Sequence, residues 1–209
     1  MDNDKILAWT KAERLSFADL LEDLDEHEWR VDSLCSGWTV RDVAAHLTMS
    51  TRDTLPGMIK GIVRARGDWN RMMADQARKR AAEFEPADLI AQIRETAGSA
   101  KRAPFAAALD PLVDALVHGQ DIARPLGRAR EMPPEPTIAA IEHVRASAFY
   151  GARKRLKGIT LVATDLDWSA GEGPDEIRGT TADLLLLASG RTTGLSSLSG
   201  PGTERMALS

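Results

Sequence analysis

The segment "TVRDVAAHLTMSTRDTLPGMI", residues 39–59, decides the fold, because it has two incompatible interpretations. Its T-x-x-D-V-A start, apolar turn and S-x-x-x-T continuation are similar to a helix-turn-helix, whose second helix would enter the major groove of DNA. As one long helix that begins at Thr39 and runs to the break at Pro56-Gly57, it would instead carry His46 into a helical bundle. A histidine in that position can be a metal ligand.

Several features disfavour the DNA-binding interpretation. Thr48 occupies the turn, where a glycine would be comfortable, and Pro56-Gly57 would cut the supposed recognition helix after six residues. Arg52 would be its only strong reader of bases or phosphates. The formal net charge of −4 lacks the basic excess that neutralises phosphates. We therefore predict one long helix that carries His46, and no nucleic-acid partner.

A second segment, "DPLVDALVHGQDIARPLG" at residues 110–127, supports a metal site. Asp114 and His118 stand four apart, so they project from one helix face, and Asp121 extends this polar stripe among apolar positions. A buried carboxylate needs a partner, and a divalent cation is one such partner. With His46 from a facing helix, Asp114 and His118 would complete the three-ligand set of a catalytic zinc site. The spacing alone leaves open a satisfied core histidine and a simple surface pair.

The rest of the chain predicts a mainly α fold. Hydrophobic residues make up 43% of the 209 residues and aromatic residues only 5%, so the core is mostly aliphatic. The proline-rich segment 127–136 is the predicted linker between a helical bundle, residues 1–126, and a small α/β module, residues 137–209. Apolar periodicity predicts helices over 4–25, 58–83, 87–102, 110–124, 137–155 and 180–190, and strands over 158–168 and 176–180.

Cysteine usage and hydropathy indicate the compartment. The single cysteine, Cys35, allows no internal disulfide, and the charged N-terminus lacks the apolar core of a signal peptide. No apolar run has membrane-spanning length. We expect a cytoplasmic protein that does not contact a membrane, in which Cys35 is an inert loop thiol. His27 and His143 are expected at exposed helix positions.

Three segments together resemble the DinB-like proteins related to mycothiol-dependent maleylpyruvate isomerase. They are "SGWTVRDVAAHL" at 36–47, "DALVHGQDIARPLG" at 114–127 and "LVATDLDWSAGEGPDEIRGTTADLLLLASGR" at 161–191. The resemblance implies a DinB-like four-helix bundle followed by a small α/β module. It also implies a divalent metal, typically zinc, held by His46, Asp114 and His118. Arg191 matches an arginine that is important in the isomerase.

The function that this resemblance implies is a metal-dependent transferase or isomerase. It would use a low-molecular-weight thiol, mycothiol by the resemblance, on a small electrophilic substrate, as a monomer or a homodimer. The alternative is a non-catalytic DinB-like bundle that binds a metal or a small ligand. One departure concerns the carboxylate: the family commonly has Glu where this chain has Asp114, whose reach is one methylene shorter.

Overall fold

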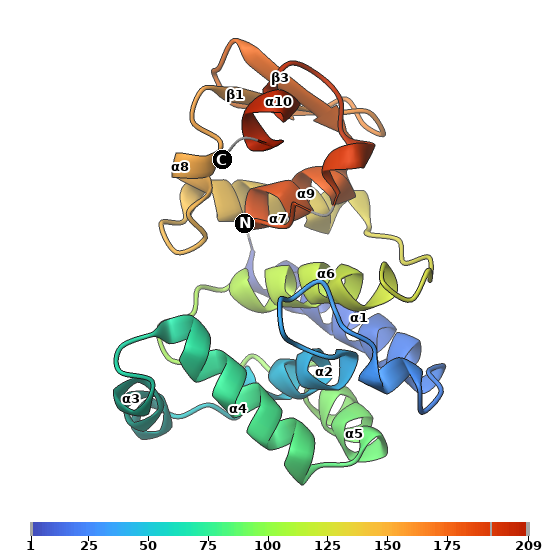
Figure 1. Ribbon diagram of the computed structural model, residues 1–209, viewed down its shortest axis with the longest axis vertical. Coiled ribbons are helices and arrows are strands. Elements are labelled where there is room, and N and C mark those ends of the chain that lie inside the picture. The colour runs from blue at the N-terminus through green and yellow to red at the C-terminus, as the bar shows by residue number, and fades with distance from the viewer. Residues whose placement is uncertain (1, 193, 208–209) are drawn as a thin grey trace. The chain divides into compact units, whose positions relative to one another are not determined.

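A computed structural model describes residues 2–192 and 194–207, which form two compact units, Met1–Arg130 and Glu131–Ser209 (Figure 1). Helices dominate the first unit, and the second combines helices with a small sheet. The predicted mainly α fold with a small α/β C-terminal part is therefore confirmed. In the described part of the chain, no helix is both long enough and apolar enough to cross a membrane.

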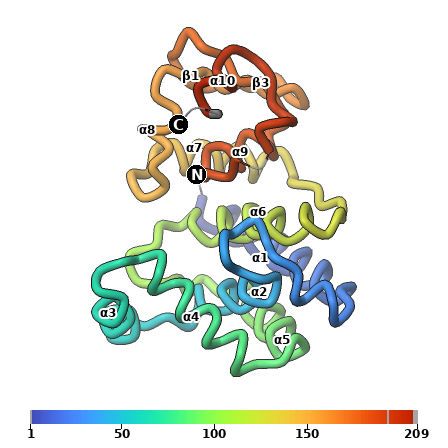
Figure 2. The backbone as a smooth tube through the Cα atoms, in the orientation of Figure 1, coloured from blue at the N-terminus to red at the C-terminus, as the bar shows by residue number. Residues whose placement is uncertain are grey.

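The first unit is built from helices that enclose one aliphatic core. They are α1 (Asn3–Glu22), the short 3-10 helix η1 (Glu28–Arg30), α2 (Val40–Met49), α3 (Leu55–Arg64), α4 (Trp69–Glu83), α5 (Pro86–Thr96) and α6 (Asp110–Ala123). Helix α1 packs against α5 and α6, α2 packs against the same two helices, and α4 lies along α2 (Figure 2). Phe17, Val43, Leu89 and Ile122 are fully buried where these helices meet. Burial of such side chains stabilises each helix against its neighbours by about 1.5–3 kcal/mol per residue.

The predicted single long helix after Thr39 is wrong, because the segment forms two helices. Helix α2 ends at Met49, and α3 begins at Leu55 behind an N-cap at Thr54. Pro56 lies in the first turn of α3, where its missing N–H costs nothing, whereas in a continuous helix its ring would clash with the preceding turn. The proline therefore starts a helix and does not kink one.

Three other predicted helices are also shorter or divided. Residues 58–83 separate into α3 and α4, because Arg66 and Gly67 both have positive φ, at 56° and 87°, and turn the chain. Residues 137–155 divide at the extended C-cap Ser147, and Gly151 at φ 68° precedes the next helix. The predicted helix 87–102 ends at Thr96. Periodicity located these helices, but the local turns set their ends.

The second unit places a three-stranded sheet against helices. Its elements are α7 (Pro134–Ala146), α8 (Ala152–Arg155), β1 (Ile159–Ala163), β2 (Ser169–Ala170), β3 (Asp175–Gly179), α9 (Thr181–Ser189), η2 (Leu195–Ser197) and α10 (Gly202–Ala207). The strand order is β2-β1-β3, antiparallel for β1 with β2 and parallel for β1 with β3. Leu161 pairs with Ile177 in this register, and both are buried. Helix α9 packs against α7 and contacts β1 and β3, which covers one face of the sheet.

A buried ion pair fastens the end of the first unit to its first helix. Arg130 donates to the carboxylate of Glu13 at 2.8 Å and to the hydroxyl of Ser16 at 2.6 Å, and the paired side chains are only 4% and 6% exposed. A Cβ at Gly119 would clash with the side chain of Arg130, so a larger residue there would displace the guanidinium where it crosses α6. Burial lowers the pKa of Arg130 and raises that of Glu13, while their mutual attraction opposes both shifts.

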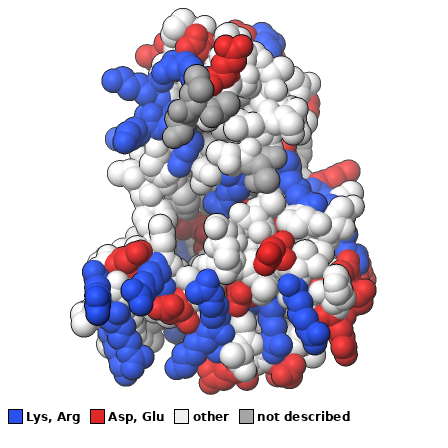
Figure 3. Space-filling view, in the orientation of Figure 1, with Lys and Arg blue, Asp and Glu red and all other residues white. Residues whose placement is uncertain are grey.

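Surface charge in the first unit is mixed. On the face drawn in Figure 3, basic side chains over α3, α4 and α5 are interspersed with acidic ones. Pairs such as Arg71 with Asp75, at 3.9 Å and more than half exposed, are typical of this surface. Such exposed pairs contribute little to stability, whereas removing one partner of the buried pair of Glu13 and Arg130 would leave an uncompensated buried charge.

We predict that Glu13→Ala lowers the free energy of unfolding by about 3 kcal/mol, because it leaves the buried guanidinium of Arg130 without its counter-charge. Chemical denaturation followed by circular dichroism measures the change. Arg71→Ala, which removes an exposed ion pair, is the matched control and should leave the midpoint unchanged. Equal midpoints for both variants would contradict a structural role for the buried pair.

Candidate metal centre

The three predicted ligands converge between α2 and α6. His46 projects from α2, and Asp114 and His118 project from successive turns of α6, which packs against α2. The donor atoms of these three side chains all lie within 4.8 Å of one another. The two imidazole rings meet edge to face, with centroids 5.0 Å apart and an interplanar angle of 77°. The i, i+4 spacing on α6 therefore presents two donors to the third from α2.

The start of α2 is fixed by a capping box. The Thr39 hydroxyl accepts from the N–H of Asp42, and the Asp42 carboxylate accepts from the N–H of Thr39. These reciprocal bonds satisfy two of the donors that a helix start leaves unpaired. Trp38, just before this cap, stacks edge to face on His46 at a centroid distance of 5.3 Å. The cap and this ring contact together set the position of His46.

Asp121 selects which nitrogen of His118 can bind a cation. Nδ1 of His118 lies 2.9 Å from Oδ2 of Asp121, whose side chain is 0% exposed, and the His118 side chain is 11% exposed. In the neutral tautomer this geometry assigns, Nδ1–H donates to the carboxylate and the Nε2 lone pair is left for a ligand. A carboxylate behind a histidine in this way fixes the ring orientation at many metal sites.

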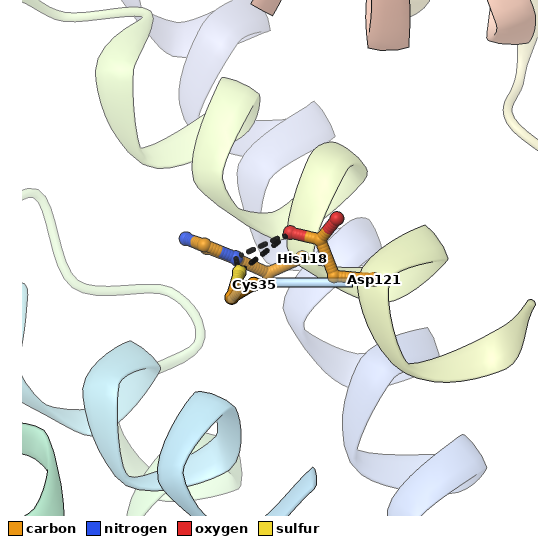
Figure 4. Close-up of side chains that lie close together, drawn as sticks. All are labelled: Cys35, His118 and Asp121. Atoms are coloured by element: carbon orange, nitrogen blue, oxygen red, sulfur yellow. Dashed lines mark hydrogen bonds and ion pairs between the residues drawn. The ribbon is translucent and has the colours of Figure 1, made fainter. Parts of the chain in front are cut away.

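Cys35 also contacts the carboxylate of Asp121, and the sequence did not predict this contact. Its Sγ lies 3.1 Å from Oδ2 of Asp121 and 3.7 Å from Nδ1 of His118 (Figure 4). Cys35, His118 and Asp121 form a second group of potential metal-ligand atoms that lie within 4.8 Å of one another. His118 belongs to both groups. Its Nδ1 faces Asp121 and Cys35, so a metal ion bound by His46 and Asp114 would bind His118 through the other nitrogen, Nε2.

The loop that carries Cys35 is docked onto α6 by main-chain bonds. The N–H of Leu34 donates to the main-chain carbonyl of Asp121 at 3.0 Å, near the end of α6. Ser33 and Trp38 close the loop, since the N–H of Ser33 donates to the Trp38 carbonyl at 2.8 Å. Gly37 takes φ 74° at its tip, a conformation that favours glycine. No local pattern in the sequence predicts this contact between the loop and α6.

The surroundings of His118 favour positive charge. Burial alone would lower the pKa of this histidine, but its interactions with Cys35 and Asp121 overcome burial and raise the pKa to about 10. A cation at this ring would experience the same attraction as the proton. The raised pKa stabilises the metal-free fold fully below the ordinary pKa of 6.5, and this contribution is lost as the pH rises through about 10.

Arg14 supplies a second buried charge beside the site. Its guanidinium donates to the carbonyls of Thr96 and Ala97 at the end of α5, and to the hydroxyl of Ser50. Burial lowers the pKa of Arg14, and the negative charge of Asp114 opposes that shift. Arg14 therefore lies close enough to Asp114 to balance its charge, a role that helix periodicity did not predict.

The donor chemistry fits a divalent metal. Two imidazole nitrogens and one carboxylate oxygen are ligands that zinc accepts, at metal distances of about 2.0–2.2 Å. Tetrahedral ligands at those distances lie ~3.4 Å apart. The donor atoms of His46, Asp114 and His118 lie within 4.8 Å of one another, so side-chain rotation could bring them to that spacing.

Arg191 belongs to the second unit. It follows α9, whose C-cap Gly190 has φ 97°, and its N–H donates to the carbonyl of Leu186 at 2.8 Å, as in a Schellman ending. Its Nη1 donates to the carbonyl of Ser189 at 3.3 Å. The predicted capped helix that Gly190 closes is observed, whereas the role of Arg191 towards a substrate stays a prediction.

Fold and site together define a class: a mainly helical protein with a histidine and carboxylate donor set between two bundle helices, followed by a small α/β unit. A family model described as the mycothiol maleylpyruvate isomerase N-terminal domain matches residues 10–130, more than half of the chain. The chain therefore belongs to the mycothiol maleylpyruvate isomerase family, as the three segments predicted. No protein with a curated description matches it significantly.

Solved structures agree with the fold. The crystal structure of a mycothiol-dependent maleylpyruvate isomerase is similar at a TM-score of 0.65, with 12% identity over 96% of this chain and 93% of that one. A histidine-to-alanine mutant of a mycothiol-dependent maleylpyruvate isomerase gives a TM-score of 0.63 with the same identity and coverage. At this low identity the likeness shows a shared fold.

We predict that Asp121→Asn lowers the pKa of His118 in the metal-free protein, because it removes one of the two neighbours that raise it. An NMR pH titration of the His118 ring protons measures the shift. Asp75→Asn, an exposed acidic position on α4, is the control and should leave the titration unchanged. An unaltered His118 titration in Asp121→Asn would contradict the assigned contact.

Proposed function

We propose that this chain is a metal-dependent enzyme that uses a low-molecular-weight thiol of the mycothiol type to transfer or isomerise a small electrophilic substrate. The observation that carries the proposal is the convergence of the donor atoms of His46, Asp114 and His118 within 4.8 Å. Membership of the family supports the thiol, and the name of the similar crystal structures, mycothiol-dependent maleylpyruvate isomerase, supports a small electrophilic substrate.

The metal we propose is zinc. His46 and His118 would each bind it through an imidazole nitrogen, and Asp114 through a carboxylate oxygen, so that three protein ligands leave a position open. A zinc ion held by these residues would supply Lewis-acid chemistry that favours the nucleophilic thiolate form of a thiol. Asp121 would hold the His118 ring in place through Nδ1.

The surrounding residues would shape the site for an anionic thiol. The edge-to-face contact of Trp38 with His46 places an apolar wall beside the donors and limits the access of water to His46. Arg14 balances the charge of Asp114 from the side of α1. For Arg191, which belongs to the second unit, the resemblance to the family supports a role in binding a substrate carboxylate, which its planar guanidinium matches in bidentate fashion.

The proposed compartment is the cytoplasm. A thiol cofactor has to be kept reduced to act as a nucleophile, and a chain with one cysteine, Cys35, forms no internal disulfide. Both features suit a reducing compartment.

The first test is the metal content of protein made without a polyhistidine tag. We predict about one zinc per chain, and its loss in His46→Ala/His118→Ala, because three protein ligands are the usual minimum for such a site. The matched control is His27→Ala/His143→Ala, which removes two histidines outside the donor set and should keep the metal. Equal metal content in both double variants would remove the basis of the proposal.

Catalysis is tested by thiol consumption. We predict that the zinc-loaded protein accelerates the disappearance of mycothiol with a generic electrophile, or isomerises maleylpyruvate when mycothiol is present. In His46→Ala the rate of the catalysed reaction should fall by at least about 100-fold, because the metal site loses one of its three protein ligands. A protein that binds zinc and accelerates neither reaction would be the non-catalytic binding module.

Arg191→Lys tests the proposed carboxylate contact. Lysine keeps the charge but cannot bind a carboxylate in bidentate fashion, so we expect KM for a carboxylate-bearing substrate to rise by about tenfold. KM for an uncharged electrophile should stay unchanged, which serves as the control in the same variant. Equal effects on both substrates would contradict substrate binding by Arg191.

A further inference from the structure

We infer that Cys35 is a positioning residue of the metal centre, which acts on His118 through the buried carboxylate of Asp121. Sγ of Cys35 and Nδ1 of His118 both approach Oδ2 of Asp121, at 3.1 Å and 2.9 Å. The thiol of Cys35 thereby fixes the carboxylate oxygen of Asp121, and that oxygen orients the imidazole of His118. This inference rests on the proposed metal centre and extends it to a residue that coordinates nothing.

Cys35 is held in place by its own loop. Its N–H donates to Oγ of Ser33 at 3.1 Å, and that hydroxyl donates to the carbonyl of Trp38 at 2.8 Å. The neighbouring Leu34 is bonded to the main chain of Asp121 at 3.0 Å. The cysteine main chain is therefore tied to the residue whose side chain its thiol contacts, so the thiol reaches the carboxylate with only χ1 left to set.

The energetic reason lies in the burial of Asp121. A carboxylate that is 0% exposed has exchanged its water for hydrogen bonds from the protein, and each missing donor is costly. Cys35 and His118 are two donors to the same oxygen. Sγ also lies 3.7 Å from Nδ1 of His118, so the thiol is packed against both partners of the bond between His118 and Asp121.

Direct coordination by Cys35 is the competing role, and the geometry disfavours it. Sγ of Cys35 lies 3.7 Å from Nδ1 of His118, the nitrogen that faces Asp121, whereas the nitrogen left for the metal is Nε2. The bonding directions of the two ring nitrogens diverge, so a metal bound at Nε2 would lie away from Sγ. Cys35 would reach such an ion only if His118 released Asp121.

The experiment compares Cys35→Ser, Cys35→Ala and Cys35→Val. Serine keeps a donor, alanine removes donor and bulk, and valine removes the donor but keeps the bulk, so it separates hydrogen bonding from packing. Ser36→Ala, an exposed neighbour in the same loop, is the matched control. Two readouts are needed: solvent exchange of the His118 Nδ1 proton in metal-free protein by NMR, and the zinc Kd by competition with a chromophoric chelator.

We expect Cys35→Ala and Cys35→Val to exchange the Nδ1 proton about tenfold faster and to bind zinc about tenfold more weakly, the lower end of effects seen for residues behind metal ligands. Cys35→Ser and Ser36→Ala should stay close to the unchanged protein. Unaltered proton exchange in Cys35→Ala and Cys35→Val would overturn the inference, as would sulfur-to-metal charge-transfer absorption in the cobalt-substituted protein.

The two readouts separate this inference from the proposed function. If the unchanged protein bound no zinc, the metal centre would be refuted, while the proton exchange in metal-free protein would still decide whether Cys35 positions His118. If zinc bound normally and exchange did not respond to Cys35, the metal centre would stand without this residue.

Discussion

The contact between the buried carboxylate of Asp121 and Nδ1 of His118 is the interaction on which the site depends. A carboxylate with no exposed surface must be satisfied by fixed donors, and it obtains them from the histidine at 2.9 Å and from Cys35 at 3.1 Å. These contacts of Asp121 determine the tautomer of His118 and the direction in which its Nε2 points. They also fix the position of the loop that carries Cys35. These all follow from one residue near the end of α6.

The second constraint is the start of α2. The capping box of Thr39 and Asp42 fixes the first turn, and His46 follows seven residues after the cap, about two turns along. Because α2 packs against α6, fixing where α2 starts also fixes which of its residues meets His118. The bridge between Asp32 and Thr39 ties this cap to the loop of Cys35. One short segment thus places both His46 and the thiol that contacts Asp121.

Much of this was predictable from the sequence, and the failures share a cause. The i, i+4 spacing placed Asp114 and His118 on one helix face because helix geometry is a local signal, and the resemblance to the family linked them to His46. The break between α2 and α3 was misplaced because Pro56 excludes a helix through it but does not say where the preceding helix ends. The contact of Cys35 with Asp121, 86 residues apart, leaves no local pattern at all.

The shorter carboxylate of Asp114 is compatible with the small residues that are buried beside the proposed ligands on α2 and α6. A helix separation depends on the size of the side chains at the contact. Ala45 beside His46 and Ala115 beside Asp114 are both fully buried, so small residues flank proposed ligands on each of the packed helices. Small residues allow helices to lie close together, so that a short carboxylate on one helix can reach a donor on the other. Asp114 accordingly brings a carboxylate oxygen within 4.8 Å of the donor atoms of His46 and His118, and the positive charge of Arg14 attracts the same carboxylate.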